Sequence, residues 1–322
     1  MINYIQRTPL HTVFAGLVIL TALWLPDILA STTNYPHVLP QAAQSRLLAM
    51  PWLSGLWVSL LLTALTAVLL FVSNLRHLFV ATNDRLMLLL YLILSSALPE
   101  TLYYPEARLA AIAVIIGLYC LFQSYQKSAA LTQLFLSAMW ISIAGLCYFP
   151  AVTILFTVAI GILTTRQCSW RDCTAFLAGF FCPYFYFGLY LFWTEDTIIS
   201  LIHSLSQNFH PFELPLVAHN LYEYIFVITL IVIIVWVFLS REAKGALNKI
   251  RVVHLRHANN WLLICILIAV IIFRPAYGSI MPLLAIPLSV IIANADKQLW
   301  RKKVYIFFLL LLTTAIIGSR LT

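Results

Sequence analysis

Runs of apolar residues separated by short polar stretches follow one another along almost the whole chain. An α-helix needs about 20 apolar residues to cross the hydrocarbon core of a bilayer, and fewer where other helices surround it. The pattern therefore predicts an all-α transmembrane helix bundle of about eleven helices in one integral membrane domain, residues 1–322. The predicted spans are 12–31, 52–73, 86–98, 109–123, 132–148, 151–165, 174–193, 220–240, 261–273, 277–293 and 304–319.

The composition excludes most classes of soluble protein. Hydrophobic residues make up 62% of the chain and charged residues 9%, and the mean hydropathy is +0.95. Soluble domains are about 45–50% apolar and about 25% charged, because polar groups must cover much of their surface. A soluble enzyme, a nucleic-acid-binding domain and a disordered chain are therefore excluded. Membrane lipid is the partner that this composition predicts.

The distribution of charge predicts the orientation of the spans. With the N-terminus in the cytoplasm, fifteen of the nineteen Lys and Arg residues fall on the cytoplasmic side. The four exceptions are Arg46, Arg108, Arg274 and Arg320. Because cytoplasmic loops carry an excess of Lys and Arg, this arrangement is favoured over its inverse. We predict a multi-pass protein of the bacterial inner membrane with a cytoplasmic N-terminus, whose first apolar run is an anchor rather than a cleaved signal.

The acids of the outward-facing segments are the candidates for chemistry. Asp27 directly follows the first apolar run, at the expected boundary of the bilayer, where ionisable groups are costly and often functional. The segment between the third and fourth runs adds Glu100 and Glu106. The histidines of the outer loop 194–219 lack the close spacing of a zinc site. No cofactor is expected, but the sequence leaves open a divalent cation held by Asp27 and a second outer carboxylate against a phosphate.

Residues 135–193 carry a pattern that resembles a known family. A helix of small residues leads into Tyr148-Phe149-Pro150, an apolar run, Ser169-Trp170-Arg171, Gly179 and Pro183-Tyr184. Together with the segment 95–100, this pattern is similar to that of polytopic inner-membrane proteins of Bacteroidota that share a domain of unknown function. The resemblance implies a membrane bundle and no particular activity.

A more distant resemblance is to the GT-C glycosyltransferases. It rests on the helices and basic loop at 135–171 and on the segment 274–287, which is similar to the Arg-x-x-Tyr…Pro segment of that family. The resemblance implies a GT-C-like bundle that transfers a sugar from a polyprenyl-phosphate donor on the outer face. Asp27 occupies the place of the catalytic acid, without the second acid that usually accompanies it.

The enzyme hypothesis assigns roles to four further residues. Arg274 and Tyr277 would bind the donor, because a guanidinium can meet a phosphate with two hydrogen bonds. Glu100 and Glu106 would orient the sugar or hold the cation. The enzyme hypothesis predicts that Asp27, Glu100 and Arg274 converge on one outward cavity. The alternatives are a non-catalytic scaffold or lipid-handling subunit of the cell envelope and, disfavoured by the scarcity of intramembrane charge, a transporter.

Overall fold

The structure, a computed structural model, describes most of the helical core of the chain. The described residues are 56–77, 84–97, 101, 104–124, 130–165, 169–193, 221–240, 250–273 and 277–295, with Val18, Trp24, Thr313, Thr314, Ile316 and Gly318. The predicted spans 12–31 and 304–319 lie almost wholly outside them. All regular secondary structure in the described part is helical, as predicted.

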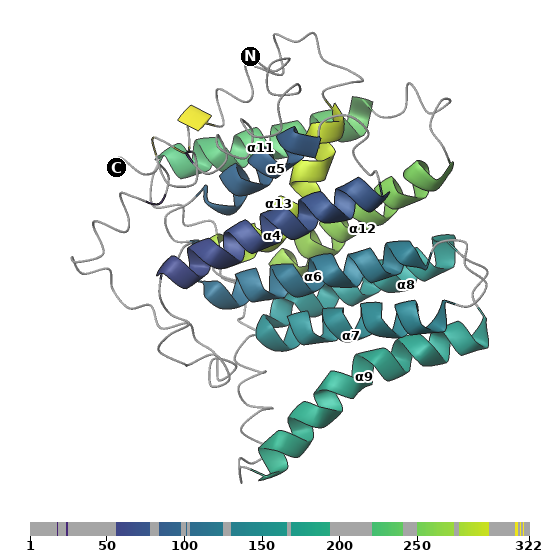
Figure 1. The fold of residues 1–322 in the computed structure, drawn as a ribbon. Helices are drawn as coiled ribbons and strands as arrows, with labels where there is room; N and C mark the ends of the chain where they lie inside the picture. Colours follow the sequence, from purple (N-terminus) through teal and green to yellow (C-terminus); the bar gives the residue numbers. More distant parts are fainter. Residues whose placement is uncertain are drawn as a thin grey trace.

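Nine α-helices make up this described part (Figure 1). They are α4 (Leu56–His77), α5 (Asp84–Ser95), α6 (Pro105–Gln123), α7 (Leu131–Cys147), α8 (Ile154–Thr165), α9 (Trp170–Trp193), α11 (Leu221–Ser240), α12 (Ile250–Phe273) and α13 (Tyr277–Ala295), with a 3-10 turn, η2 (Phe149–Thr153), before α8. Each coincides with one predicted apolar run. Within the described residues, α4, α6, α9 and α12 are long and apolar enough to cross a membrane; the total of eleven spans stays a prediction.

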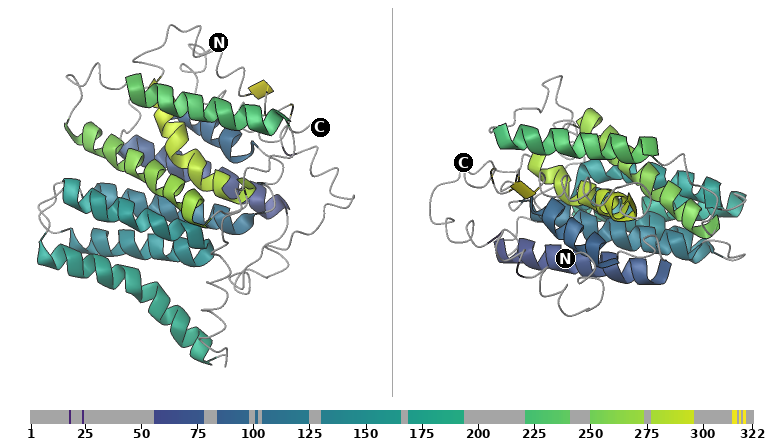
Figure 2. Two further views of the ribbon diagram at one scale, coloured as in Figure 1. Left: turned by 180° about the vertical axis from the view of Figure 1, so that it is seen from behind. Right: turned by 90° about the horizontal axis from the view of Figure 1, so that it is seen from above.

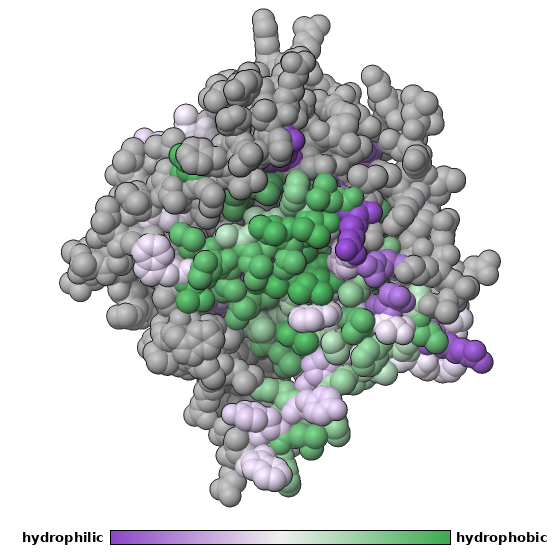
Figure 3. Space-filling view, in the orientation of Figure 1, coloured by the Kyte–Doolittle hydropathy of each residue, from purple (hydrophilic) through white to green (hydrophobic). Residues whose placement is uncertain are grey.

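Helix α4 carries polar residues on its buried face and apolar residues on its exposed face. The exposed side chains, three or four residues apart, are Trp57, Leu61, Leu65, Val68, Val72 and Leu75. The buried polar side chains are Ser59, Thr63, Thr66, Ser73 and Asn74. A helix at the surface of a water-soluble protein has the reverse arrangement, whereas small and hydroxyl residues are enriched between helices in a membrane. The broad apolar surface over α4 in Figure 3 is therefore a surface suited to lipid.

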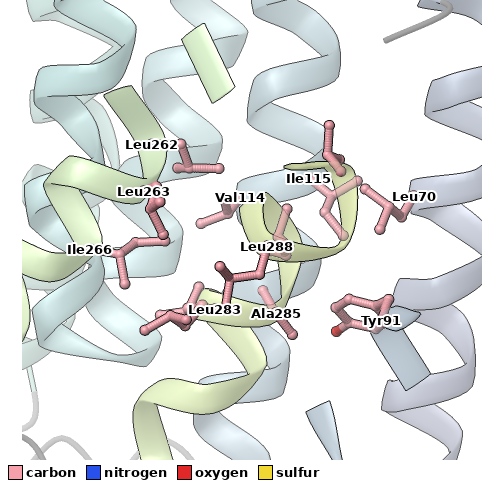
Figure 4. Close-up of a cluster of buried hydrophobic side chains, with 14 of the residues drawn as sticks. Leu70, Tyr91, Val114, Ile115, Leu262, Leu263, Ile266, Leu283, Ala285 and Leu288 are labelled. Atoms are coloured by element: carbon pink, nitrogen blue, oxygen red, sulfur yellow. The ribbon is translucent and has the colours of Figure 1, made fainter. Parts of the chain in front are cut away.

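Helix α13 lies in the middle of the bundle. All described side chains from Gly278 to Ala293 are buried, as expected for a helix that is apolar all round and enclosed by others. Figure 4 shows Leu283, Ala285 and Leu288 of α13 between side chains of α12 and those of α4, α5 and α6. The core therefore forms around a helix that comes late in the sequence.

Two hydrogen bonds between α4 and α6 define the two ends of the bundle. At one end, Arg108 near the start of α6 hydrogen-bonds to Thr63 in the first half of α4. At the other end, Arg76 of α4 donates a hydrogen bond of 2.5 Å to the hydroxyl of Tyr119 of α6. The helices α4 and α6 thus run parallel, side by side, as Figures 1 and 2 show. We call the first end the Tyr148 end, after a residue described below, and the second the Arg76 end.

The chain reverses direction between α12 and α13. The amide of Asn259 in α12 donates a hydrogen bond of 3.2 Å to the backbone carbonyl of Pro287 in α13. These residues lie at similar distances along the chain from the break at 274–276, so the two helices form an antiparallel hairpin. The end of α12 and the start of α13 therefore lie at the same end of the bundle.

Several helices begin earlier than the apolar pattern predicts, α6 and α12 among them. Helix α12 begins at Ile250 rather than at 261, because polar residues can extend a helix beyond its apolar part. Helix α6 begins at Pro105 rather than at 109, since proline is well tolerated in a first helical turn and Glu106 is favourable there. Glu106 and Arg108, predicted to lie in an outer loop, are therefore helical residues.

The positive-inside rule predicts that the Arg76 end faces the cytoplasm. Described basic residues at that end include Arg76, Arg85 and Arg171, near the end of α4 and the starts of α5 and α9. Reporter fusions after Lys127 and Lys244 are expected to be cytoplasmic, and a fusion after Glu213 extracytoplasmic. Activities of alkaline phosphatase and green fluorescent protein fused at these positions measure this directly. A cytoplasmic position for residue 213 would contradict the orientation.

Candidate functional site at the Tyr148 end of the bundle

The first turn of α6 brings two charged residues into the Tyr148 end. Glu106 is half-buried, and Arg108 is only 1% exposed. Because successive residues of an α-helix are about 100° apart, residues 106 and 108 point to nearly opposite sides of α6. The site therefore has two parts, one around each side chain.

The Arg108 part joins residues of the first predicted span, of α4 and of the segment between α5 and α6. The guanidinium of Arg108 donates hydrogen bonds to the hydroxyl of Thr63 and, over 2.7 Å, to the backbone carbonyl of Thr101. It also lies over the ring of Trp24, 5.0 Å from the ring centroid, a favourable cation–π geometry. Trp24 is fully buried, and its indole N–H donates a hydrogen bond of 3.0 Å to the hydroxyl of Ser96.

A chain of buried hydroxyls supports this arrangement. The hydroxyl of Tyr91 donates to Thr66 over 2.8 Å, and the hydroxyl of Thr66 donates to the carbonyl of Thr63 over 2.8 Å. The hydroxyl of Thr63 donates to the carbonyl of Ser59 over 2.7 Å and so presents its oxygen to Arg108 as an acceptor. Burying a charge costs several kcal/mol unless such partners compensate for it. The network therefore makes the deep position of Arg108 tolerable.

The Glu106 part centres on Tyr148, which connects α7 to η2. The buried hydroxyls of Tyr148 and Ser279 lie 2.7 Å apart in a hydrogen bond. Tyr104 and Glu106 are close enough to act electrostatically on the hydroxyl of Tyr148. The phenolic and alcoholic hydroxyls and the carboxylate gathered here are groups that can hydrogen-bond to a sugar or to water.

The structure describes some of the residues predicted from the sequence to form the site. Glu106 lies at the Tyr148 end, and Tyr277 is the first residue of α13, with a side chain outside the described residues. Asp27, Glu100 and Arg274 also lie outside them.

The described neighbours of those three residues all lie at the Tyr148 end. Trp24 and Thr101 both contact Arg108. Phe273, which precedes Arg274, stacks edge-on against Phe149 at a centroid distance of 5.1 Å, next to Tyr148. Because Asp27, Glu100 and Arg274 themselves are not described, their predicted convergence on one cavity stays a prediction.

The proposed divalent cation also stays a prediction. Among the described residues, no group of three His, Cys, Asp or Glu side chains is placed to hold a metal ion. Two of the carboxylates that could hold the cation, those of Asp27 and Glu100, are not among these residues.

Arg108 and Tyr148 are site residues that the sequence does not predict. In the sequence, Arg108 stands out only as an exception to the positive-inside pattern, and Tyr148 only as part of the Tyr-Phe-Pro segment. The sequence signal for Arg108 was weak, because the apolar run predicted at 109–123 begins directly after it, and only the structure shows that the helix begins at Pro105. Charged residues inside membrane helices are rare and usually face the bundle interior.

Comparison with known proteins adds no relative. No protein-family model matches the chain, and no curated protein and no solved structure is detectably similar to it.

Proposed function

We propose that this multi-pass membrane protein acts in envelope glycan or lipid-linked sugar metabolism, as a GT-C-like glycosyltransferase with a polyprenyl-phosphate sugar donor. The observation that carries the proposal is the buried Arg108, with Trp24 and Thr101 against it, at the end of the bundle that holds Glu106 and Tyr148. Ionisable groups buried between the helices of a membrane bundle commonly mark a site of function. The charge pattern supports an outward-facing Tyr148 end.

In the proposed reaction, the hydroxyl oxygen of an acceptor attacks the anomeric carbon of the donor sugar. The bond between that carbon and the phosphate oxygen breaks, and polyprenyl phosphate leaves with the electron pair. Asp27 takes the proton of the attacking hydroxyl as a general base. Arg274 holds the donor phosphate and Tyr277 contributes to its binding, while Glu100 and Glu106 hydrogen-bond to the sugar.

The arrangement around Glu106 supports an interaction with sugar hydroxyls. Glu106 is half-buried rather than surrounded by water, and it lies within electrostatic reach of the hydroxyl of Tyr148, which is hydrogen-bonded to that of Ser279. Hydrogen bonds to ionised groups are roughly twice as strong as those between neutral groups. A carboxylate near fixed hydroxyls can therefore orient a polar ligand at the Tyr148 end of the bundle.

Binding of the donor lipid is the first test. The purified chain in detergent is titrated with synthetic polyprenyl phosphate and, as the control, with the polyprenol of the same length, which lacks the phosphate. We expect a rise in the thermal unfolding midpoint that depends on the phosphate. Equal shifts with both lipids would contradict a phosphate-binding site.

A deletion strain provides the second measurement. Loss of a transferase is expected to cause accumulation of its lipid-linked sugar donor, detectable by mass spectrometry of extracted lipids. The non-catalytic alternative, a scaffold or lipid-handling subunit, is favoured by the absence of accumulation together with a normal growth phenotype of an Asp27→Asn strain.

A further inference from the structure

The exposed apolar face of α4 ends beside an exposed arginine. Its exposed apolar side chains begin at Trp57 and end at Leu75, and Arg76 follows directly. At a rise of 1.5 Å per residue, residues 57 and 76 lie about 28 Å apart, close to the thickness of the hydrocarbon core of a bilayer. A bilayer around α4 would therefore place Trp57 at one boundary of that core and the guanidinium of Arg76 near the lipid phosphates at the other.

Tyr119 of α6 fixes one side of this guanidinium. Nη1 of Arg76 donates a hydrogen bond of 2.5 Å to the hydroxyl of Tyr119, and the guanidinium carbon lies 5.8 Å from the centroid of the tyrosine ring. Within the described part of the chain, this is the one hydrogen bond of the Arg76 side chain. A guanidinium has five N–H groups, and two of them can bind one phosphate together. Arg76 can therefore bind a phosphate while Tyr119 restricts the motion of its side chain.

The Arg76 end of the bundle carries a net positive charge. The described helical residues at that end include five arginines and two aspartates, namely Arg76, Arg85, Arg171, Arg251 and Arg256, with Asp84 and Asp172. Basic groups near a membrane surface attract lipids whose headgroups are negatively charged. A zwitterionic headgroup gains less from such a surface, because its own positive charge opposes the attraction of its phosphate. This end therefore favours an anionic phospholipid.

The apolar and basic surfaces adjoin each other. Figure 3 shows the broad apolar surface over α4 next to a band of hydrophilic residues, on the side where α4 and α6 end. The exposed side chains of α4 nearest to Arg76 are those of Leu75, Val72 and Val68, which share one face of the helix. One phospholipid can therefore place its acyl chains on these three side chains and its phosphate at Arg76.

We propose that Arg76, together with Tyr119 and the exposed apolar face of α4, forms a binding site for an anionic phospholipid. The phosphate accepts two hydrogen bonds from the guanidinium, and the acyl chains lie along α4 toward the middle of the bilayer. In the predicted orientation this lipid belongs to the cytoplasmic leaflet. The proposal does not rest on the proposed function, because the Arg76 end lies opposite the Tyr148 end.

The test compares Arg76→Gln with Arg171→Gln. Both arginines are exposed at the same end of the bundle, so each substitution removes one positive charge from that end. Helices α6 and α7 lie between α4 and α9 (Figure 1). Three interhelical distances of about 8–10 Å each exceed the screening length of about 8 Å at physiological salt. Arg171→Gln therefore measures the effect of overall charge, and Arg76→Gln that of the proposed site.

The purified full-length chain in detergent is titrated with phosphatidylglycerol at physiological salt, and the bound lipid is counted by native mass spectrometry. Arg76→Gln is expected to raise the Kd for phosphatidylglycerol on the order of tenfold, because it removes hydrogen bonds between charged groups. Arg171→Gln is expected to leave the Kd near that of the unaltered chain. Equal increases in both variants would overturn the proposal in favour of a general attraction to positive charge. An unchanged Kd in Arg76→Gln would overturn it outright.

Two control ligands separate the contributions of the headgroup and the acyl chains. Phosphatidylcholine with the same acyl chains keeps the phosphate but has no net charge, and glycerol phosphate keeps the phosphate but lacks the chains. We expect both to bind more weakly than phosphatidylglycerol. Equal binding of phosphatidylcholine would overturn the preference for an anionic headgroup. Equal binding of glycerol phosphate would overturn a lipid site in favour of a site for free phosphate.

Arg76→Lys keeps the test decisive if Arg76→Gln does not fold. Lysine retains the positive charge and an apolar stem, but its ammonium group cannot reproduce the planar pair of N–H groups that binds a phosphate. The Kd for phosphatidylglycerol is therefore expected to rise in this variant as well. An unchanged Kd in a folded Arg76→Lys protein would contradict binding of the phosphate by a planar guanidinium.

Discussion

Asp27→Asn is expected to lower the rate of sugar transfer by about 10²–10⁴-fold, the usual contribution of a general base. Asparagine keeps the shape of the aspartate and removes its ability to accept a proton at neutral pH. Membrane insertion and abundance are expected to remain normal, because the substitution removes a charge from a boundary position. Transfer from the donor in isolated membranes, normalised to the amount of protein, measures the effect.

Glu195→Gln is the matched control for this experiment. Glu195 is an acid of the predicted outer loop 194–219, and the substitution removes its charge in the same conservative way. The rate of sugar transfer is expected to stay near normal, because the proposed reaction gives this acid no role. Near-normal rates in both variants would reject Asp27 as the base and favour the non-catalytic scaffold.

The helices could be predicted from the sequence because burial in lipid demands long apolar runs. The predicted runs at 52–73 and 132–148 differ from α4 and α7 by only a few residues at either end. The rule fails where a helix continues through polar residues, as in the first part of α12. It also fails at the start of α6, where Pro105 and Glu106 favour a helix start but interrupt the apolar pattern.

The candidate site was harder to predict because its interacting side chains come from different helices. From the sequence, Arg108 is one charge near an expected loop, and Thr63 is one hydroxyl in an apolar run. Only the pairing of α4 with α6 shows that they bond to each other. Tyr148 and Ser279 are 131 residues apart, so no local pattern could have joined them.

The small residues noted in the sequence do have a structural explanation. Helices α7 and α9 approach closely where Ala138 and Ser142 of α7 face Gly179 and Phe180 of α9. The hydroxyl of Ser142 donates a hydrogen bond of 2.7 Å to the carbonyl of Phe180. Small residues allow membrane helices to pack backbone against backbone and to form such bonds. Beyond Tyr184, none of the described side chains of α9 is buried, so this close contact is what attaches the helix.

Gly179→Ala is therefore expected to destabilise the bundle. A Cβ atom at residue 179 would lie 2.3 Å from the backbone oxygen of Phe135 and 3.1 Å from the Cβ of Ala138. Backbone atoms cannot rotate away as a side chain can, so α9 must shift outward from α7. Overpacking of this kind costs about 1–3 kcal/mol in the free energy of unfolding. The thermal unfolding midpoint of the purified chain in detergent is expected to fall accordingly.

Gly188→Ala, in the same helix, is the control that isolates the cause. No atom lies within 4 Å of the Cβ position at residue 188, so the added methyl group meets open space. Replacing glycine by alanine inside a helix is then expected to raise the free energy of unfolding by about 0.5–1 kcal/mol, because alanine loses less backbone entropy on folding. The two substitutions are chemically identical and should change the midpoint in opposite directions. A stable Gly179→Ala protein would mean that α9 does not depend on close backbone contact with α7, and equal destabilisation by both substitutions would show that the close contact at residue 179 is not the cause.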